Sequence, residues 1–236
     1  MKYNICLLVI LMTISLTEQQ TLSLKSYSTL RYRIVTNSWR DLIGVQVECP
    51  NDGLFKNIKL RVENGYFWYD FECYSSEKKE TDYGAAIIKF SNATLRTPFN
   101  ASPSEKNLAY LTNIKFGDSV DYTLKSFAIK KQGTSHFVNT TSHGMKTSFQ
   151  TKYEVQTEKR TGNMNTLDPL NNILIGRTDK ETADIIGYPL RGFKYNVVGN
   201  TFYFTYSYAK LRNMKPVLDS YKQRFKDLRD KNDQKN

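Results

Sequence analysis

Two similar strings of residues, far apart in the chain, restrict the fold more than any other feature of the sequence. Residues 55–62 read Phe-Lys-Asn-Ile-Lys-Leu-Arg-Val, and residues 190–197 read Leu-Arg-Gly-Phe-Lys-Tyr-Asn-Val. Both strings place apolar residues at the same spacing and a basic residue second. Eleven residues after the start of each string an aromatic-rich string begins, at 66–73 and at 201–208. This similarity, which keeps its register without a gap, predicts that both segments form the same unit of structure.

Each copy has the pattern of a β-hairpin. The dipeptides Asn64-Gly65 and Gly199-Asn200 separate the two strings and tolerate the positive φ angles of a tight turn. Because side chains alternate between the faces of a strand, the apolar residues of each string share one face. In the first copy these are Ile58, Leu60 and Val62, then Phe67, Tyr69, Phe71 and Cys73; in the second they are Phe193, Tyr195 and Val197, then Phe202, Phe204, Tyr206 and Tyr208. In this register Tyr208 and Asp184 replace Cys73 and Cys49.

A weaker third copy lies between the first two. Residues 124–129 repeat the pattern of the first string, but the second string, near Phe137 to Thr141, is degenerate. It also carries the glycosylation motif of Asn139, and a glycan cannot enter a core. We therefore expect this strand to lie at a sheet edge or to be replaced by a loop. The repeat units are predicted near 44–75, 118–143 and 182–210, with two copies or three as open alternatives.

The remaining segments complete an all-β body at 18–212. Short strands are expected at 27–35, 85–90, 148–155 and 173–176, and exposed loops at 100–107 and 158–168. The predicted fold is all-β, with antiparallel sheets built from two or three related hairpin repeats in a sandwich- or prism-like arrangement.

The C-terminal segment, 213–236, has a different pattern and is predicted to be an amphipathic helix followed by a frayed basic tail. After Pro216, one helical face carries Val217, Leu218, Tyr221, Phe225 and Leu228. We expect this face to pack on the β body; contact with a membrane surface or a partner is the alternative.

The N-terminal segment predicts secretion. Lys2 precedes an apolar run at 5–14, and polar residues follow, as in a signal peptide covering about residues 1–17. The run is too short to anchor a chain in a bilayer, which takes about 20 residues. We therefore expect a secreted protein, extracellular or associated with the cell surface.

Removal of the signal peptide, with Cys6 in it, leaves Cys49 and Cys73 as the two cysteines. An oxidising compartment favours a disulfide between them, which would stabilise the fold by roughly 3 kcal/mol in the chain-entropy model. Two free thiols or an intermolecular bond are the alternatives. Three acceptor motifs, at Asn92, Asn100 and Asn139, predict N-glycosylation and agree with secretion.

The sequence contains few residues that could carry catalysis. His136 and His143 are the two histidines, they are expected in an exposed loop, and neither belongs to a metal-binding or catalytic-triad spacing. Asp70 and Glu72 could be imagined as the acid and base of a glycosidase, but their i, i+2 spacing is common. We therefore expect no catalytic residues, no metal and no cofactor.

The net charge of +11 favours acidic partners, although solubility alone would also explain it. The expected partners are an extracellular protein or an acidic polysaccharide, and not nucleic acid. The hairpin face opposite the apolar one is the candidate binding face, because aromatic rings suit the apolar face of a sugar and cations suit its acidic groups. Its residues are Lys59, Arg61, Tyr66 and Trp68 in the first copy and Lys194 and Tyr203 in the second. Packing of this face against another sheet is the alternative, and the favoured one.

The first copy also resembles a known kind of module. From Val47-Glu48-Cys49-Pro50 to Cys73 the chain is similar to cysteine-flanked, two-stranded repeats of extracellular and cell-surface proteins of unicellular eukaryotes. The resemblance covers 44–74, and covers 182–210 only in part because both cysteines are missing there. It implies a surface, matrix or adhesion role. We therefore expect a secreted, non-catalytic structural or adhesive protein; the alternatives are a lectin-like binder of acidic glycans and, more remotely, a glycoside hydrolase.

Overall fold

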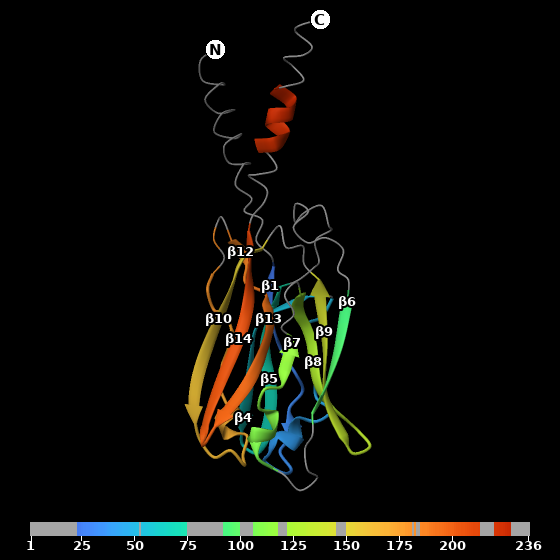
Figure 1. Cartoon of the computed structure of the whole chain (residues 1–236), viewed down its shortest axis with the longest axis vertical. Coiled ribbons are helices and arrows are strands. Elements are labelled where there is room, and N and C mark those ends of the chain that lie inside the picture. The colour runs from blue at the N-terminus through green and yellow to red at the C-terminus, as the bar shows by residue number, and fades with distance from the viewer. Residues whose placement is uncertain are drawn as a thin grey trace, which may run out of the picture.

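The computed structural model describes residues 23–51, 53–74, 92–99, 106–117, 122–144, 150–180, 182, 185–212 and 220–227. The predicted fold class is confirmed. The described body consists of three antiparallel sheets, and an α-helix at 220–227 follows it near the C-terminus (Figure 1). The strand candidate at 85–90 lies outside the described residues.

Each sheet is built around one β-hairpin. Sheet 1 contains β4 (Leu54–Glu63) and β5 (Tyr66–Tyr74), sheet 2 contains β8 (Tyr122–Gln132) and β9 (Ser135–Gly144), and sheet 3 contains β13 (Leu190–Val198) and β14 (Thr201–Arg212). The predicted hairpins at 55–73 and 190–208 are therefore present. Asn64 and Gly65, with φ angles of 52° and 77°, form the first turn as expected.

In each sheet a further strand, β1 (Leu24–Ser28), β6 (Asn92–Phe99) or β10 (Gln150–Thr161), pairs with the second strand of the hairpin and forms one edge of the sheet. β1 and the short β2 (Tyr32–Arg33) pair with β5, and β6 pairs with β9. β10 and β12 (Ile185–Gly187) pair with β14. The loop expected to begin at residue 158 is wrong in its first residues, because β10 stays paired with β14 as far as Thr161.

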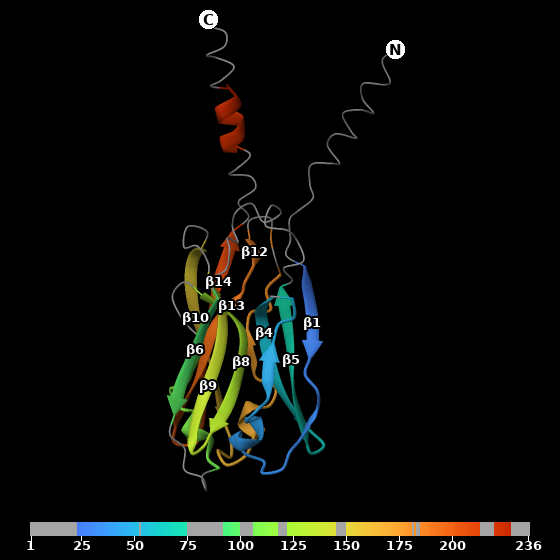
Figure 2. The same cartoon turned by 90° about the vertical axis from the view of Figure 1, so that its right-hand side faces the viewer.

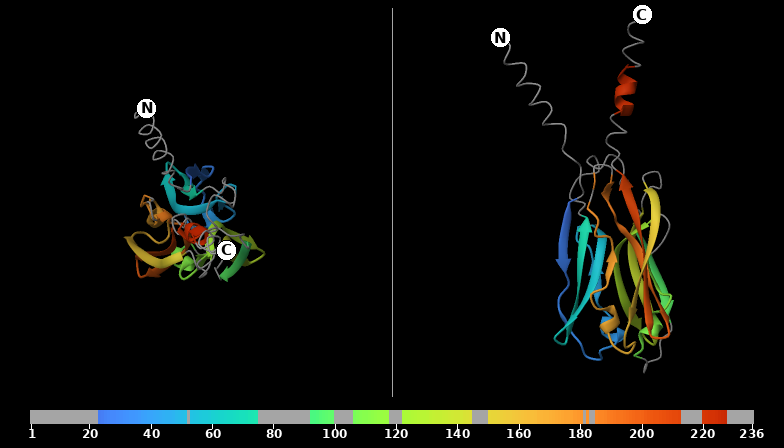
Figure 3. Two further views of the ribbon diagram at one scale, coloured as in Figure 1. Left: turned by 90° about the horizontal axis from the view of Figure 1, so that it is seen from above. Right: turned by 90° about the vertical axis from the view of Figure 1, so that its left-hand side faces the viewer.

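Three short strands link the sheets in a cycle. β3 (Gln46–Glu48) precedes the first hairpin in the chain but pairs with β8, and β7 (Lys115–Gly117) precedes the second but pairs with β13. β11 (Leu174–Gly176) precedes the third hairpin and pairs with β4, which closes the cycle. Seen along the long axis, the three sheets surround a common centre (Figure 3). The number of repeat copies and their superposition remain predictions.

The same irregularity occurs in the first strand of every hairpin. The register of β4 shifts between Phe55 and Asn57, that of β8 between Leu124 and Ser126, and that of β13 between Leu190 and Gly192. The extra residue of each bulge is basic: Lys56, Lys125 and Arg191. The basic second residue of the similar strings is therefore the bulge residue in all three sheets.

The inward faces of the three sheets share one aromatic core. The ring of Phe127 lies 6.1 Å from that of Phe55 in sheet 1 and 5.4 Å from that of Phe193 in sheet 3. Phe193 in turn stacks on Phe116 at 4.5 Å. Because β4, β8 and β13 all contribute to this centre, each sheet buries its inward face there.

The predicted disulfide is confirmed and it joins two sheets. Cys49 directly follows β3, and its N–H donates to the carbonyl oxygen of Lys125 in sheet 2. Cys73 belongs to β5 in sheet 1, and the two Cα atoms are 5.9 Å apart. The bond therefore ties the short strand of one sheet to the hairpin of another.

Two expectations are wrong. β9 is neither an edge strand nor a loop, because it lies between β8 and β6. The helix at 220–227 does not pack on the β body: Tyr221 is 55% exposed and Phe225 71% exposed. The sheets already bury their inward faces against one another, so the body offers this helix no open apolar surface of that kind. No helix among the described residues has the length and apolar character needed to cross a membrane.

Candidate functional site

The outward face of sheet 1 carries a groove of about 450 Å³. It crosses β11, β4, β5 and β1, the last two of which lie side by side in Figure 2. Its lining combines hydroxyl, amide, carboxylate and basic side chains with a few apolar ones: Ser26, Tyr27, Ser28, Asn57, Lys59, Arg61, Asp70, Phe71, Glu72, Leu174 and Thr178. The groove therefore lies on the face that the sequence indicated for binding.

Strand pairing arranges the groove in rows. Leu174, Lys59, Asp70 and Ser28 are cross-strand neighbours in one row. Gly176, Asn57, Glu72 and Ser26 form the next row. Since Ile58 and Phe71 point into the core, the residues on either side of them point outward. Gly176 has no side chain, so the second row is low at its β11 end.

Asp70 is held by three donors. Its Oδ1 accepts from Ser28 Oγ at 2.7 Å and from Trp68 Nε1 at 3.0 Å, and its Oδ2 accepts from Arg61 Nε at 3.0 Å. Arg61 also donates to Asn172 Oδ1. The interactions join β1, β4, β5 and the turn before β11. They fix the Asp70 carboxylate and leave it little capacity for a ligand.

Trp68 is less available than its sequence position suggests. The guanidinium of Arg31 lies 4.6 Å from the centre of the Trp68 ring system, a cation–π contact. The indole N–H is already donated to Asp70. A sugar ring could stack on this face of Trp68 only by displacing Arg31.

Lys59 and Glu72 are the groove charges that stay open to a ligand. Lys59 has no hydrogen bond or ion pair within the described part of the chain. Glu72 accepts from Asn57 Nδ2 through Oε2, which leaves Oε1 open, and Asn57 is oriented by a second bond to the carbonyl oxygen of Arg177. Because Lys59 pairs with Asp70 and Asn57 with Glu72, Lys59 and Glu72 are diagonal neighbours, within reach of one small ligand.

The groove has no net charge. Lys59 and Arg61 contribute two positive charges, and Asp70 and Glu72 contribute two negative ones. Ser26 and Thr178 add hydroxyl groups that make no hydrogen bond to any described residue. The surface therefore offers donors and acceptors side by side, without an excess of either charge.

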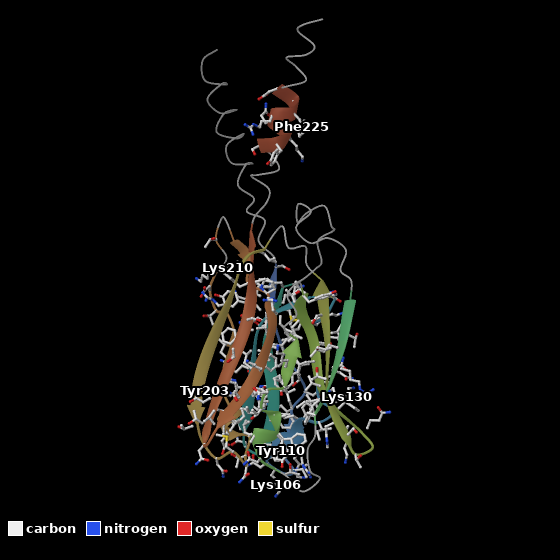
Figure 4. All side chains as sticks on the ribbon, viewed as in Figure 1. Lys106, Tyr110, Lys130, Tyr203, Lys210 and Phe225 are labelled. Atoms are coloured by element: carbon white, nitrogen blue, oxygen red, sulfur yellow. A yellow bond between two sulfur atoms is a disulfide. The ribbon has the colours of Figure 1, made fainter. Side chains whose placement is uncertain are left out.

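The other predicted binding residues lie elsewhere. Tyr66 is 45% exposed at the turn end of β5, outside the groove lining. Lys194 and Tyr203 lie on sheet 3, where Tyr203 is labelled in Figure 4. The two hairpins thus do not combine into one site. The favoured expectation that this face packs against another sheet is wrong, because Lys59, Arg61 and Trp68 are only half-buried.

Local sequence reasoning missed the groove residues outside the first hairpin. Ser26 and Ser28 come from β1, and Leu174 and Thr178 come from β11 and the residues after it. They meet Lys59 and Glu72 through pairing between strands distant in the chain. No spacing in the sequence identifies them.

The predicted glycosylation residues have different settings. Asn92 begins β6 at the edge of sheet 2, and Asn100 lies outside the described residues. Asn139 lies on β9 and is half-buried, and its Oδ1 is buried without a hydrogen-bond partner in the described structure. Glycosylation at these positions remains a prediction.

The histidines are not in an exposed loop, so that expectation is wrong. His136 and His143 are 4% and 2% exposed on β9, which lies between β8 and β6. Among the described residues no group of three or more His, Cys, Asp or Glu side chains is placed to hold a metal ion.

Comparison with known proteins gives no relative for this chain. No model of a protein family, no curated protein and no solved structure matches it.

Proposed function

We propose that this chain is a secreted, non-catalytic adhesive protein that binds a neutral saccharide in the groove of sheet 1. The observation that carries the proposal is the pair of Lys59 and Glu72, diagonal neighbours with bonding capacity left open. Two adjacent sugar hydroxyls suit this pair, since one can accept a hydrogen bond from the Lys59 ammonium while the other donates to Glu72. The disulfide is compatible with an extracellular location.

A neutral ligand fits the groove better than an acidic one. The hypothesis of an acidic glycan came from the charge of the whole chain, +11, whereas the charges in the groove cancel. A sulfate or uronate placed near Lys59 would also approach Asp70 and Glu72. The negative charge of such a ligand would be repelled by these two carboxylates, which would reduce its affinity.

The carboxylates of the groove support binding and not turnover. Glycosidases place two carboxyl groups on opposite sides of the scissile bond. Asp70 and Glu72 instead project from the same face of β5, and Asp70 is occupied by Ser28, Trp68 and Arg61. We therefore expect no hydrolysis of a bound saccharide.

The test is a glycan array with the secreted protein, followed by titration calorimetry of the sugars that bind. Lys59→Gln should weaken binding of a neutral saccharide at least tenfold, with little change in melting temperature because Lys59 makes no hydrogen bond or ion pair to the described residues. Lys194→Gln removes the same charge from sheet 3 and should leave this binding unchanged. Equal losses in both variants, or no neutral ligand on the array, would refute the proposal.

Binding of an acidic polysaccharide is a second candidate, and it belongs to sheet 3. Lys194 and Lys115 are cross-strand neighbours there, and Thr205 is the next residue in the same row. Tyr203 lies one row along the same strand face. If this site operates, sulfated glycans should bind in low salt, and Lys194→Gln should weaken that binding while Lys59→Gln does not.

A further inference from the structure

The helix at 220–227 is exposed along its whole length. Every one of its residues is exposed to solvent, and it lies beyond one end of the sheets in the views of Figures 1 and 2. Phe225 is labelled on this helix in Figure 4. The helix therefore carries two large apolar side chains, Tyr221 and Phe225, that the described β body does not cover.

These aromatic side chains form one face of the helix. Tyr221 and Phe225 are four residues apart, a spacing that places side chains next to each other on a helix. At about 100° per residue, Arg224 lies on one side of this pair and Lys222 on the other. Lys226 is further round on the Lys222 side.

The uncharged amide and the carboxylate of this helix lie on the face opposite the aromatic pair. Gln223 and Asp227 occupy the side away from the aromatic pair, and Gln223 Nε2 donates to Asp227 Oδ1 at 2.8 Å. The acidic residue of the helix is thus directed away from the aromatic face, and the cations border it. An apolar face bordered by cations, with the carboxylate on the opposite side, is the arrangement that an anionic membrane surface attracts.

We propose that the helix at 220–227 binds the surface of an anionic lipid bilayer, with Tyr221 and Phe225 inserted at the headgroup level and Lys222, Arg224 and Lys226 near the lipid phosphates. Tyrosine and phenylalanine suit this depth because their rings are buried while the tyrosine hydroxyl stays hydrated. From such a position, lysine and arginine side chains bury their aliphatic stems and extend their charged groups toward the lipid phosphates and water. The inference does not depend on the saccharide groove.

A lipid surface fits this helix better than a protein groove. Protein grooves for helices are filled by apolar residues over several turns, at positions i, i+3, i+4 and i+7. The described helix has two turns and one aromatic pair, with cations on both sides. Such a short helix is marginal alone in water, so we expect lipid binding to increase its helix content.

The experiment is co-sedimentation of the full secreted chain with two kinds of vesicles, phosphatidylcholine alone and phosphatidylcholine with about one third phosphatidylserine. The protein should sediment with the anionic vesicles in low salt and be released by 0.5 M salt, and it should leave the neutral vesicles unbound. The double variant Tyr221→Ala/Phe225→Ala should lose at least four fifths of the binding. Leu30→Ala/Leu95→Ala removes two exposed apolar side chains from the β body and should keep it.

Three results would overturn the proposal. The first is no sedimentation with anionic vesicles in low salt. The second is equal binding to both kinds of vesicles, or equal losses in the two double variants. The third is a dimer in analytical ultracentrifugation that Tyr221→Ala/Phe225→Ala converts to monomer, because the aromatic face would then bind a second copy of the chain. All variants can be checked for folding by the melting temperature of the β body, which these exposed positions should not change.

Discussion

At the scale of single residues, His136 is a buried titratable side chain surrounded by aromatic rings. Its ring lies edge-on to Trp39 at 5.3 Å and near Phe99 at 5.6 Å, and its Nδ1 is buried without a hydrogen-bond partner among the described residues. Burial lowers the pKa of His136 below its ordinary value, and the positive charges of Lys131 and Arg40 lower it further. The environment of the folded protein therefore favours the neutral form of this imidazole.

This environment predicts a loss of stability in mild acid. In the unfolded chain His136 takes up a proton near its ordinary pKa of about 6.5, whereas in the folded protein it does so only at a lower pH. Protons then favour the unfolded state as the pH falls below about 6.5, until the folded pKa is reached. Urea denaturation should give a lower free energy of unfolding at pH 5 than at pH 7.5. In His136→Phe, which keeps a ring beside Trp39, the difference between the two pH values should be smaller. An unchanged pH dependence in His136→Phe would assign the effect to other groups.

The sequence did not indicate the burial of His136. Its strand reads Ser-His-Phe-Val-Asn-Thr-Thr-Ser-His, and the glycosylation motif of Asn139 suggested an edge strand or a loop. β9 is instead a central strand between β8 and β6, and several of its polar residues are buried: Thr140 is 2% and Ser142 7% exposed. Burial that depends on distant segments leaves no periodic signal in the strand itself.

At the scale of elements, the first and third hairpins are tied to the short strand that precedes each of them by different means. The bond between Cys49 and Cys73 joins the residue after a short strand to the second strand of the following hairpin. At the third hairpin, Arg177 directly follows the short strand β11, and Tyr208 in β14 pairs with Leu190 as Cys73 pairs with Phe55. Arg177 Nη1 donates to Tyr208 Oη at 2.6 Å, and the guanidinium lies 4.8 Å from the ring centre. The sequence register placed Asp184 at the position of Cys49, whereas the residue that directly follows the short strand β11 is Arg177.

We predict different losses of stability at these two positions. Cys73→Ser should lower the free energy of unfolding by roughly 3 kcal/mol, because the closed loop constrains the unfolded chain. Tyr208→Phe should lower it by about 1.5 to 3 kcal/mol, the usual range for a hydrogen bond to a charged group. Tyr203→Phe, on the outward face of the same strand, should have little effect. Thermal and urea denaturation measure all three.

Secreted, folded Cys73→Ser protein should remain detectable, because Arg177 and Tyr208 hold the equivalent position without a covalent bond. Complete loss of folded protein would show that the fold requires the disulfide. If Tyr208→Phe matched Tyr203→Phe, the contact with Arg177 would have no structural role.

Hairpins were easier to predict than the strands that link them. The first and third hairpins each combine a turn dipeptide with two strings of alternating residues, so all their signals are local. β3 and β7 have three residues each, too few for a period. A weak shared pattern precedes β3, β7 and β11. Gly44, Asn113 and Asn172 have positive φ angles of 85°, 62° and 60°. Their N–H groups donate to the carbonyl oxygens of Ile129, Tyr195 and Leu60, respectively, each in a hairpin. A search for apolar-x-Gly/Asn-Val/Ile would have found this pattern.

At the scale of the whole molecule, the cycle of β3, β7 and β11 makes the three sheets one unit. β11 is paired with β4 although more than 100 residues separate them in the chain. The groove depends on this closure, since β11 supplies its Leu174 wall and its low end at Gly176. Neither the closure nor the groove follows from local sequence, because both depend on which hairpin a three-residue strand joins.

Gly176 is the residue where closure is most sensitive to substitution. Its φ angle is 115°, and an added Cβ would overlap the carbonyl oxygen of Lys56 and lie 2.8 Å from Asn57 Cα. Gly199 also has a positive φ angle, 61°, but an added Cβ would meet nothing within 4 Å. The two glycines therefore separate the conformational cost of an alanine from the cost of displacing a neighbouring strand.

Gly199→Ala should lower the free energy of unfolding by about 1 to 2 kcal/mol, the cost of a left-handed alanine. Gly176→Ala should lower it by at least about 3 kcal/mol, because overlap with β4 adds to that cost. Since β11 closes the cycle, we expect one cooperative urea transition at a lower midpoint and not the separate melting of sheet 1. Saccharide binding by Gly176→Ala should fall as well, because the overlap moves β4, which carries Lys59. Equal midpoints for the two variants would show that β11 can leave β4 at little cost, and that the three sheets are not held together through this strand.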